Sequence, residues 1–181
     1  AVKTALLATK RSGFIVFEGG YHGLDLGLLP LTARAAFREP FLSWLPSDAV
    51  QRLPFGCGEL PLNQAAEALN ACGRGLAAVL VEPIQGRGGI RLSPPGWLAL
   101  LRSLCDRTKS LLIYDEVFTG LGRTGRMTFA EDVGCDLLCL GKTLGGGLPL
   151  SACVGRERIM RAWPDSTGEA LHTGTFFGDP L

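Results

Sequence analysis

Five short runs of apolar residues on consecutive positions recur along the chain. Strands that are covered on both faces read this way, because neither side of such a strand meets water. Between the runs, positions 62–72 and 96–109 carry apolar residues at helical spacing. Strands that alternate with helices predict an α/β fold, with a mostly parallel sheet and helices on both faces. The runs are FIVF at 14–17, AAVLV at 77–81, LLIY at 111–114, LLCL at 137–140 and ACV at 152–154.

The composition argues against several classes of partner. Apolar residues make up 46% of the chain and the net charge is +1, without a basic stripe, so we expect no nucleic acid and no membrane as partner. The six cysteines include no C-x-x-C pair and there are two histidines, so we expect no metal site and reduced, cytoplasmic thiols. Segment 24–59 holds four prolines and is expected to run irregularly over the surface.

Ligands of open α/β sheets bind at the carboxyl ends of the strands, so the residues that follow the apolar runs are candidates for a site. Asp115 is either a turn-capping carboxylate or a partner for a cationic heterocycle nitrogen. Lys142 is either a solvated loop lysine or an amine that forms a Schiff base with an aldehyde. Tyr21, beside His22, is either an ordinary loop aromatic or a platform for a flat cofactor ring.

Positions 120–125 read GLGRTG, which matches the spacing of a dinucleotide fingerprint. That motif needs a strand directly before it, a helix directly after it and an acidic residue about 20 positions on. Here five residues separate the apolar run from the motif, and position 145 is a glycine. We therefore do not expect a nicotinamide dinucleotide at this segment.

Five sequence blocks follow one another along the chain: FEGGYHG at 17–23, VEPIQGRGG at 81–89, YDEVFTGLGRTGRM at 114–127, DLLCLGKTLGGGLPLSACVG at 136–155 and HTGTFFGDPL at 172–181. In this order they resemble the class III aminotransferases, enzymes that depend on pyridoxal phosphate (PLP), and the resemblance extends over residues 1–181. The implied fold is the large domain of fold-type I PLP enzymes, and the implied assembly is a homodimer with shared active sites.

The resemblance implies a role for each of six residues. Lys142 would carry PLP as a Schiff base and later move the substrate proton, and Asp115 would pair with the pyridinium nitrogen. Val117 would press on one face of the ring, while Tyr21 would stack on the other with His22 beside it. Thr175 would bind the PLP phosphate of the neighbouring subunit.

The chain departs from the family pattern in several places. Phe118 stands where many members have a glutamine that hydrogen-bonds the cofactor, and Arg87 stands where members that handle γ- or δ-amino acids often carry glutamate. We expect residues 1–181 to form a PLP-binding large-domain fragment, which lacks the phosphate loop on the N-terminal side and the small domain on the C-terminal side. Glu82 ends a buried strand, and the sequence leaves open whether it orients the pocket or only satisfies loop amides.

The resemblance implies transfer of an amino group from an amine or ω-amino acid to a 2-oxo acid. Two alternatives stay open. One is another PLP reaction on the same scaffold, such as that of an aminomutase or decarboxylase. The other is a truncated, non-catalytic relative.

Overall fold

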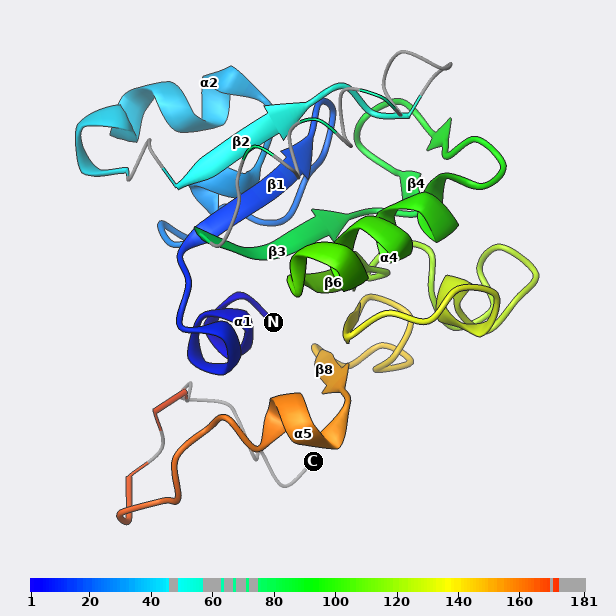
Figure 1. Cartoon of the computed structure of the whole chain (residues 1–181). Helices are drawn as coiled ribbons and strands as arrows, with labels where there is room; N and C mark the ends of the chain where they lie inside the picture. Colours follow the sequence, from blue (N-terminus) through cyan, green and yellow to red (C-terminus); the bar gives the residue numbers. More distant parts are fainter. Residues whose placement is uncertain are drawn as a thin grey trace.

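The computed structural model describes residues 1–45, 49–56, 63, 67, 71, 75–169 and 171–172, and its centre is a six-stranded sheet (Figure 1). The strand order is β2-β1-β3-β6-β7-β8. All neighbouring strands run parallel except β7 and β8. The strands are β1 (Gly13–Phe17), β2 (Val50–Leu53), β3 (Leu76–Val81), β6 (Leu111–Asp115), β7 (Leu137–Leu140) and β8 (Ala152–Gly155).

This architecture confirms the predicted mostly parallel α/β fold, and each of the five apolar runs forms a strand of the sheet. The predicted helix at 96–109 is α4 (Trp97–Thr108), whereas most of the predicted helix at 62–72 lies outside the described residues. The expectation of an irregular segment at 24–59 was wrong in part. The segment contains the edge strand β2 as well as η1 (Leu29–Leu31), α2 (Ala35–Arg38) and η2 (Glu39–Trp44).

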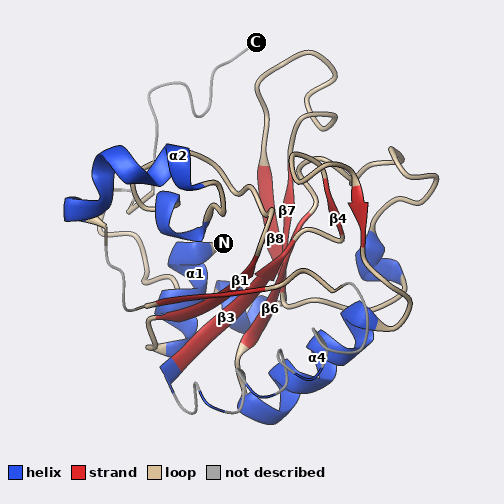
Figure 2. Ribbon diagram, turned by 90° about the horizontal axis from the view of Figure 1, so that it is seen from above, coloured by secondary structure: helices blue, strands red, loops and turns tan. Residues whose placement is uncertain are grey.

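Helices cover both faces of the sheet, which explains why the strands are apolar on consecutive positions (Figure 2). One core lies under α4, where Trp97 is fully buried and meets the ring of Phe17 edge-on at 5.2 Å between centroids. The other core lies under α1 (Val2–Thr9) and α5 (Glu157–Met160), and includes Ala5 and Ile159. A small hairpin of β4 (Ile84–Gln85) and β5 (Arg91–Leu92) extends from the carboxyl end of β3.

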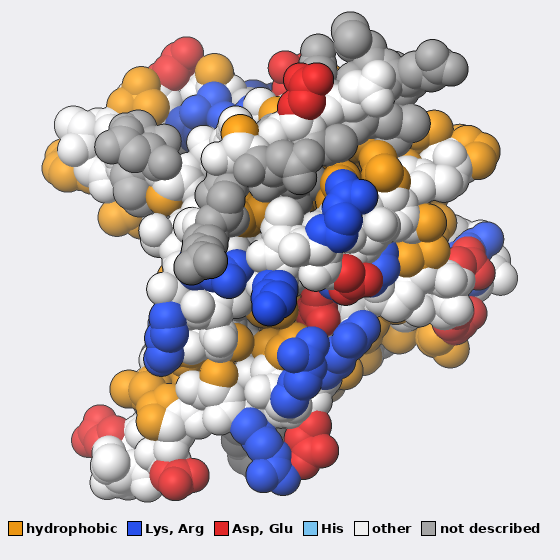
Figure 3. Space-filling view, in the orientation of Figure 1, with side chains coloured by type: hydrophobic (Ala, Val, Ile, Leu, Met, Phe, Trp, Pro, Cys, Tyr) orange, Lys and Arg blue, Asp and Glu red, His pale blue; other side chains and the backbone are white. Residues whose placement is uncertain are grey.

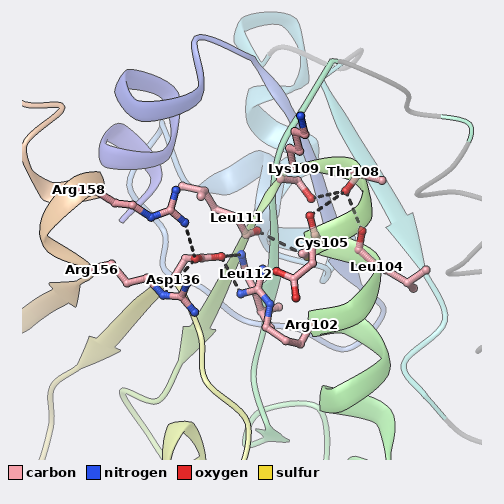
Figure 4. A network of polar contacts seen from close by, with 12 residues as sticks. Arg102, Leu104, Cys105, Thr108, Lys109, Leu111, Leu112, Asp136, Arg156 and Arg158 are labelled. Carbon is pink, nitrogen blue, oxygen red and sulfur yellow. Dashed lines mark hydrogen bonds and ion pairs between the residues drawn. The ribbon is translucent and has the colours of Figure 1, made fainter.

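A buried aspartate just before β7 contacts three elements, α4, β6 and the start of α5 (Figure 4). Asp136 is 2% exposed, and its Oδ2 accepts hydrogen bonds from Arg102 Nη1 of α4 at 2.7 Å and from the amide of Leu112 at 2.9 Å. Its Oδ1 faces Arg156 Nε at 3.5 Å and Arg158 Nη2 at 3.9 Å, from the start of α5. Lys and Arg side chains gather between α4 and α5 on the surface seen in Figure 3, and Asp136 supplies buried negative charge beneath them.

Candidate functional site

The carboxyl ends of β1, β3, β6 and β7 border one cavity of about 620 Å³. Because parallel strands present these ends at the same edge of a sheet, loops far apart in the sequence meet there. Five of the six residues singled out from the sequence line this cavity, while Thr175 lies outside the described residues. The five residues are Tyr21, His22, Asp115, Val117 and Lys142.

Asp115 is held by a histidine from another strand end. Its Oδ2 lies 2.8 Å from His22 Nδ1, and the side chains are 13% and 3% exposed respectively. An ionised carboxylate only accepts hydrogen bonds, so Nδ1 of His22 carries the proton in this pair. His22 is fixed in turn, since its amide donates to Thr32 Oγ1 at 3.1 Å and that hydroxyl donates to the carbonyl of Gly23 at 2.8 Å. Asp115 therefore has a defined orientation at the cavity wall.

Glu82 anchors the loop that carries Tyr21. Its Oε1 accepts the amide of Tyr21 at 2.8 Å and its Oε2 accepts the amide of Gly86 at 3.1 Å. The residue is 6% exposed, and burial raises the pKa of its carboxyl, while the hydrogen bond from Tyr21 opposes that rise. Of the two roles that the sequence left open, Glu82 satisfies loop amides, and in doing so it ties the end of β1 to the end of β3.

Lys142 follows β7 in an uncommon backbone conformation, with φ of 43°. Its side chain is exposed, and Nζ lies 5.8 Å from the centroid of the Phe118 ring. Among the described residues no carboxylate lies within ion-pair distance of this amine. The preceding residue, Gly141, packs tightly, since a Cβ there would lie 3.2 Å from Val117 Cγ1. The amine thus stands at the cavity with no competing ionic partner in the described chain.

Aromatic and apolar groups form the walls between the polar ones. Phe118 packs against the hairpin loop so closely that a Cβ at Gly86 would lie 2.9 Å from its ring. Tyr21 meets the ring of Phe37 edge-on at 6.1 Å, and the guanidinium of Arg87 lies over the Tyr21 ring at 4.4 Å. Sequence reasoning did not anticipate either of these contacts, since no spacing pattern relates residues of separate loops.

The GLGRTG segment forms turns away from the cavity lining. The amide of Leu121 donates to the carbonyl of Met127 at 2.7 Å, and the amide of Gly122 donates to that of Arg126 at 3.2 Å. The next element is the short 3-10 helix η4 (Phe129–Glu131) and not an α-helix that opens at the last glycine. This geometry differs from a dinucleotide-binding turn.

The described residues form neither a metal-binding cluster nor a membrane-spanning helix. Among the described residues, no three His, Cys, Asp or Glu side chains form a group that could hold a metal ion. In the same part of the chain, no helix has the length and apolarity needed to cross a membrane.

Comparison with known proteins agrees with the architecture of the sheet. The family model for class-III aminotransferases matches residues 1–181. A solved structure, described as a novel β-phenylalanine aminotransferase from Variovorax paradoxus, superposes with a TM-score of 0.77 at 32% sequence identity. The match covers 96% of this chain and 37% of that one, so the chain spans well under half of its structural relative. The chain belongs to the class-III aminotransferase family.

Proposed function

We propose that the protein is a PLP-dependent aminotransferase that moves an amino group from an amine or ω-amino acid to a 2-oxo acid. The observation that carries the proposal is the meeting of an amine and a carboxylate, Lys142 and Asp115, at one cavity of about 620 Å³. Membership of the class-III family implies PLP as the cofactor. The relative described as acting on β-phenylalanine supports a donor whose amino group is not at the α-carbon.

The donor set around the cavity fits PLP. An amine with no ionic partner among the described residues suits an aldehyde, and Lys142 provides one. A partly buried carboxylate suits a protonated ring nitrogen, and Asp115 provides one that His22 holds in place. A flat ring needs apolar surfaces, for which Val117 and Tyr21 are available.

Each residue would then have a defined task. PLP, when bound, supplies an aldehyde that condenses with amines and a ring that accepts electrons from the substrate. Lys142 would hold the cofactor through Nζ, and the same atom, once free, would remove the proton from the substrate carbon that bears the nitrogen. Asp115 would keep the ring nitrogen protonated, while the hydrogen bond from His22 would keep that carboxylate oriented. The Phe118 ring beside Nζ would limit the access of water.

The resemblance to the family also suggests how the protein assembles, and its cysteines suggest where it is located. We place Thr175 at the phosphate of the cofactor in the neighbouring subunit, so that a homodimer completes the site. We place the protein in the cytoplasm, for which buried free thiols such as Cys105 are the support.

The test is to identify the lysine that carries the cofactor. The intact protein is incubated with PLP, reduced with borohydride and digested, and the labelled peptide is mapped. We expect the label on Lys142 and its absence from Lys142→Ala, together with loss of amino transfer from a panel of amines and ω-amino acids. The matched control is Lys109→Arg, because Lys109 precedes β6 at the opposite edge of the sheet.

Two results would contradict the proposal. Label on a lysine other than Lys142 would remove the assignment of the site. Label on Lys142 without amino transfer to any 2-oxo acid would favour a different PLP reaction, such as that of an aminomutase or decarboxylase.

A further inference from the structure

A second, smaller cavity of about 290 Å³ adjoins the first on the far side of Tyr21. Tyr21 and Arg87 line both cavities, so the two spaces share a wall. Two arginines, Arg34 and Arg87, line the smaller cavity, and no acidic residue does. Positive charge is therefore concentrated beside the candidate cofactor site.

Among the described residues, no carboxylate lies within ion-pair distance of Arg34 or Arg87. Glu82 of the larger cavity is buried, and both of its oxygens already accept backbone amides. Both arginines instead lie over the Phe37 ring, at 5.4 Å and 5.5 Å from its centroid. Two like charges on one ring repel each other, and an anion between them would remove that cost.

The stacking leaves the hydrogen-bond donors of Arg87 available. Its guanidinium lies over the Tyr21 ring at 4.4 Å, which engages the flat face of the group. The N–H donors of a guanidinium lie in its plane, in a fork that matches the two oxygens of a carboxylate. No hydrogen bond from Arg87 to another described residue uses these donors.

Tight backbone packing fixes the place of Arg87. It lies in the turn between β4 and β5, where the amides of Gly89 and Ile90 both donate to the carbonyl of Gly86 at 3.3 Å. A Cβ at Gly88 would lie 2.9 Å from the carbonyl oxygen of Gly19, so the hairpin turn rests directly on the loop that precedes Tyr21. The backbone that carries the Arg87 side chain is therefore held in place by the neighbouring loop.

We propose that Arg87, assisted by Arg34, binds the carboxylate of the amino acid or oxo acid substrate. This inference rests on the function proposed above and names the substrate class of that site. The substrate would be a carboxylate-bearing amine or oxo acid whose reacting carbon faces Lys142 while its carboxylate reaches across Tyr21. A carboxylate suits the planar fork of Arg87 and the modest size of the cavity, and inorganic phosphate is the competing anion to be tested.

The experiment uses Arg87→Met in the intact protein, because methionine keeps apolar contact with the Tyr21 ring and removes every donor. Binding of 3-phenylpropanoate, which has a carboxylate and no amine, is measured by calorimetry, with 3-phenylpropanol and inorganic phosphate as comparison probes. Amino transfer is measured for β-phenylalanine and for 1-phenylpropylamine, which lacks the carboxylate. The control is Arg126→Met, since Arg126 also stacks on an aromatic ring, that of Phe129 at 4.8 Å, but pairs with Asp132 away from both cavities.

We expect Arg87→Met to weaken 3-phenylpropanoate binding by roughly 10- to 100-fold, the range for loss of a hydrogen bond to a charged group. The value of kcat/KM for β-phenylalanine should fall by a similar factor, while that for 1-phenylpropylamine stays within about two-fold and Arg126→Met changes neither, as for surface positions. Arg87→Lys should restore binding in part, because it returns the charge without the fork.

Equal losses for both amines, unchanged binding of 3-phenylpropanoate, or tighter binding of inorganic phosphate than of the carboxylate would each overturn the proposal. The calorimetric measurement needs no chemical step, so it separates this inference from the proposed function. If carboxylate binding depends on Arg87 but the protein transfers no amino group, the carboxylate site of Arg87 stands and the proposed aminotransferase function is rejected.

Discussion

Replacing Asp136 by alanine should destabilise the sheet more than any surface charge substitution. The mutation removes both strong hydrogen bonds of Oδ2, the one from Arg102 at 2.7 Å and the one from the amide of Leu112 at 2.9 Å. A buried amide left without an acceptor costs about 1–3 kcal/mol. Breaking a buried ion pair by removing one partner costs about 3–5 kcal/mol.

These two free-energy costs overlap, and the cost of breaking the ion pair with Arg102 is partly offset. Arg102 keeps a second partner, Asp106, at 2.7 Å, although that carboxylate is 64% exposed and so contributes little. Arg156 and Arg158 are themselves half-exposed or more and lie 3.5 Å and 3.9 Å from Oδ1, so their loss adds only tenths of a kcal/mol. We therefore expect a total loss of about 3–5 kcal/mol for Asp136→Ala. Asp136→Asn, which keeps one acceptor oxygen and the volume, should lose about half of that.

Hydrogen exchange measured by mass spectrometry tests this locally, alongside urea unfolding followed by tryptophan fluorescence. Protection of the peptide that contains Leu112 should fall by more than about 100-fold in Asp136→Ala, the factor that 3 kcal/mol implies when β6 opens. The control is Arg158→Ala, whose side chain is 72% exposed and whose effect should stay below about 0.5 kcal/mol. The reasoning is refuted if Asp136→Ala stays within about 1 kcal/mol of the parent protein or if Arg158→Ala costs as much.

Two further substitutions and one labelling experiment have defined outcomes. Asp115→Asn should leave the fold intact and retain some PLP, but lose most of the amino transfer measured with ω-amino acids, because an amide cannot keep a ring nitrogen protonated. A rate near that of the parent protein would show that Asp115 is only a turn residue. Burial raises the pKa of Glu116, so ionising this carboxyl costs stability as pH rises above its ordinary value. Glu116→Gln should therefore gain on the parent in urea midpoint as pH rises above about 4.5, the ordinary pKa of this carboxyl, and a difference that does not change with pH would contradict this. Burial raises the pKa of Cys105 to about 12, whereas a hydrogen bond from Cys139 lowers the pKa of Cys153. Of these two thiols, iodoacetamide at neutral pH should therefore label Cys153 first and Cys105 only on unfolding, and mapping the labelled peptides checks the order.

Much of the fold could be predicted because its signal is local. A strand buried on both faces is apolar at every position, as β3 is from Leu76 to Val81, and such runs stand out in any sequence. The strand of the six-stranded sheet that was missed, β2, reads VQRL and lies at the edge of the sheet, where only Leu53 is buried. Edge strands carry polar residues on their open side, so composition does not separate them from loops.

The site was predictable only as a set of positions. The rule that ligands meet the carboxyl ends of strands selected Asp115 and Lys142, and the structure brings both to one cavity. The contacts that orient the site join residues far apart in sequence, such as His22 and Asp115, which are 93 positions apart. Such pairs depend on strand order and register, which no local pattern encodes. The roles of these residues toward a cofactor remain predictions.

The backbone gives independent support for a functional interpretation of the cavity. In the described chain, five residues other than glycine have positive φ angles: Lys10, Ile90, Lys109, Leu121 and Lys142. Lys10 and Lys109 cap the C-termini of α1 and α4, where a left-handed residue satisfies the last carbonyls.

The remaining three positions end no helix, so capping does not explain their conformation. Two of them, Ile90 and Lys142, line the 620 Å³ cavity. A left-handed conformation costs a residue with a Cβ roughly 1–2 kcal/mol, which glycine would avoid. Glycine, which avoids this cost, occurs at positions next to both Ile90 and Lys142. A lysine that lines the cavity at this strained position, with no ionic partner in the described chain, is what a requirement for its amine predicts.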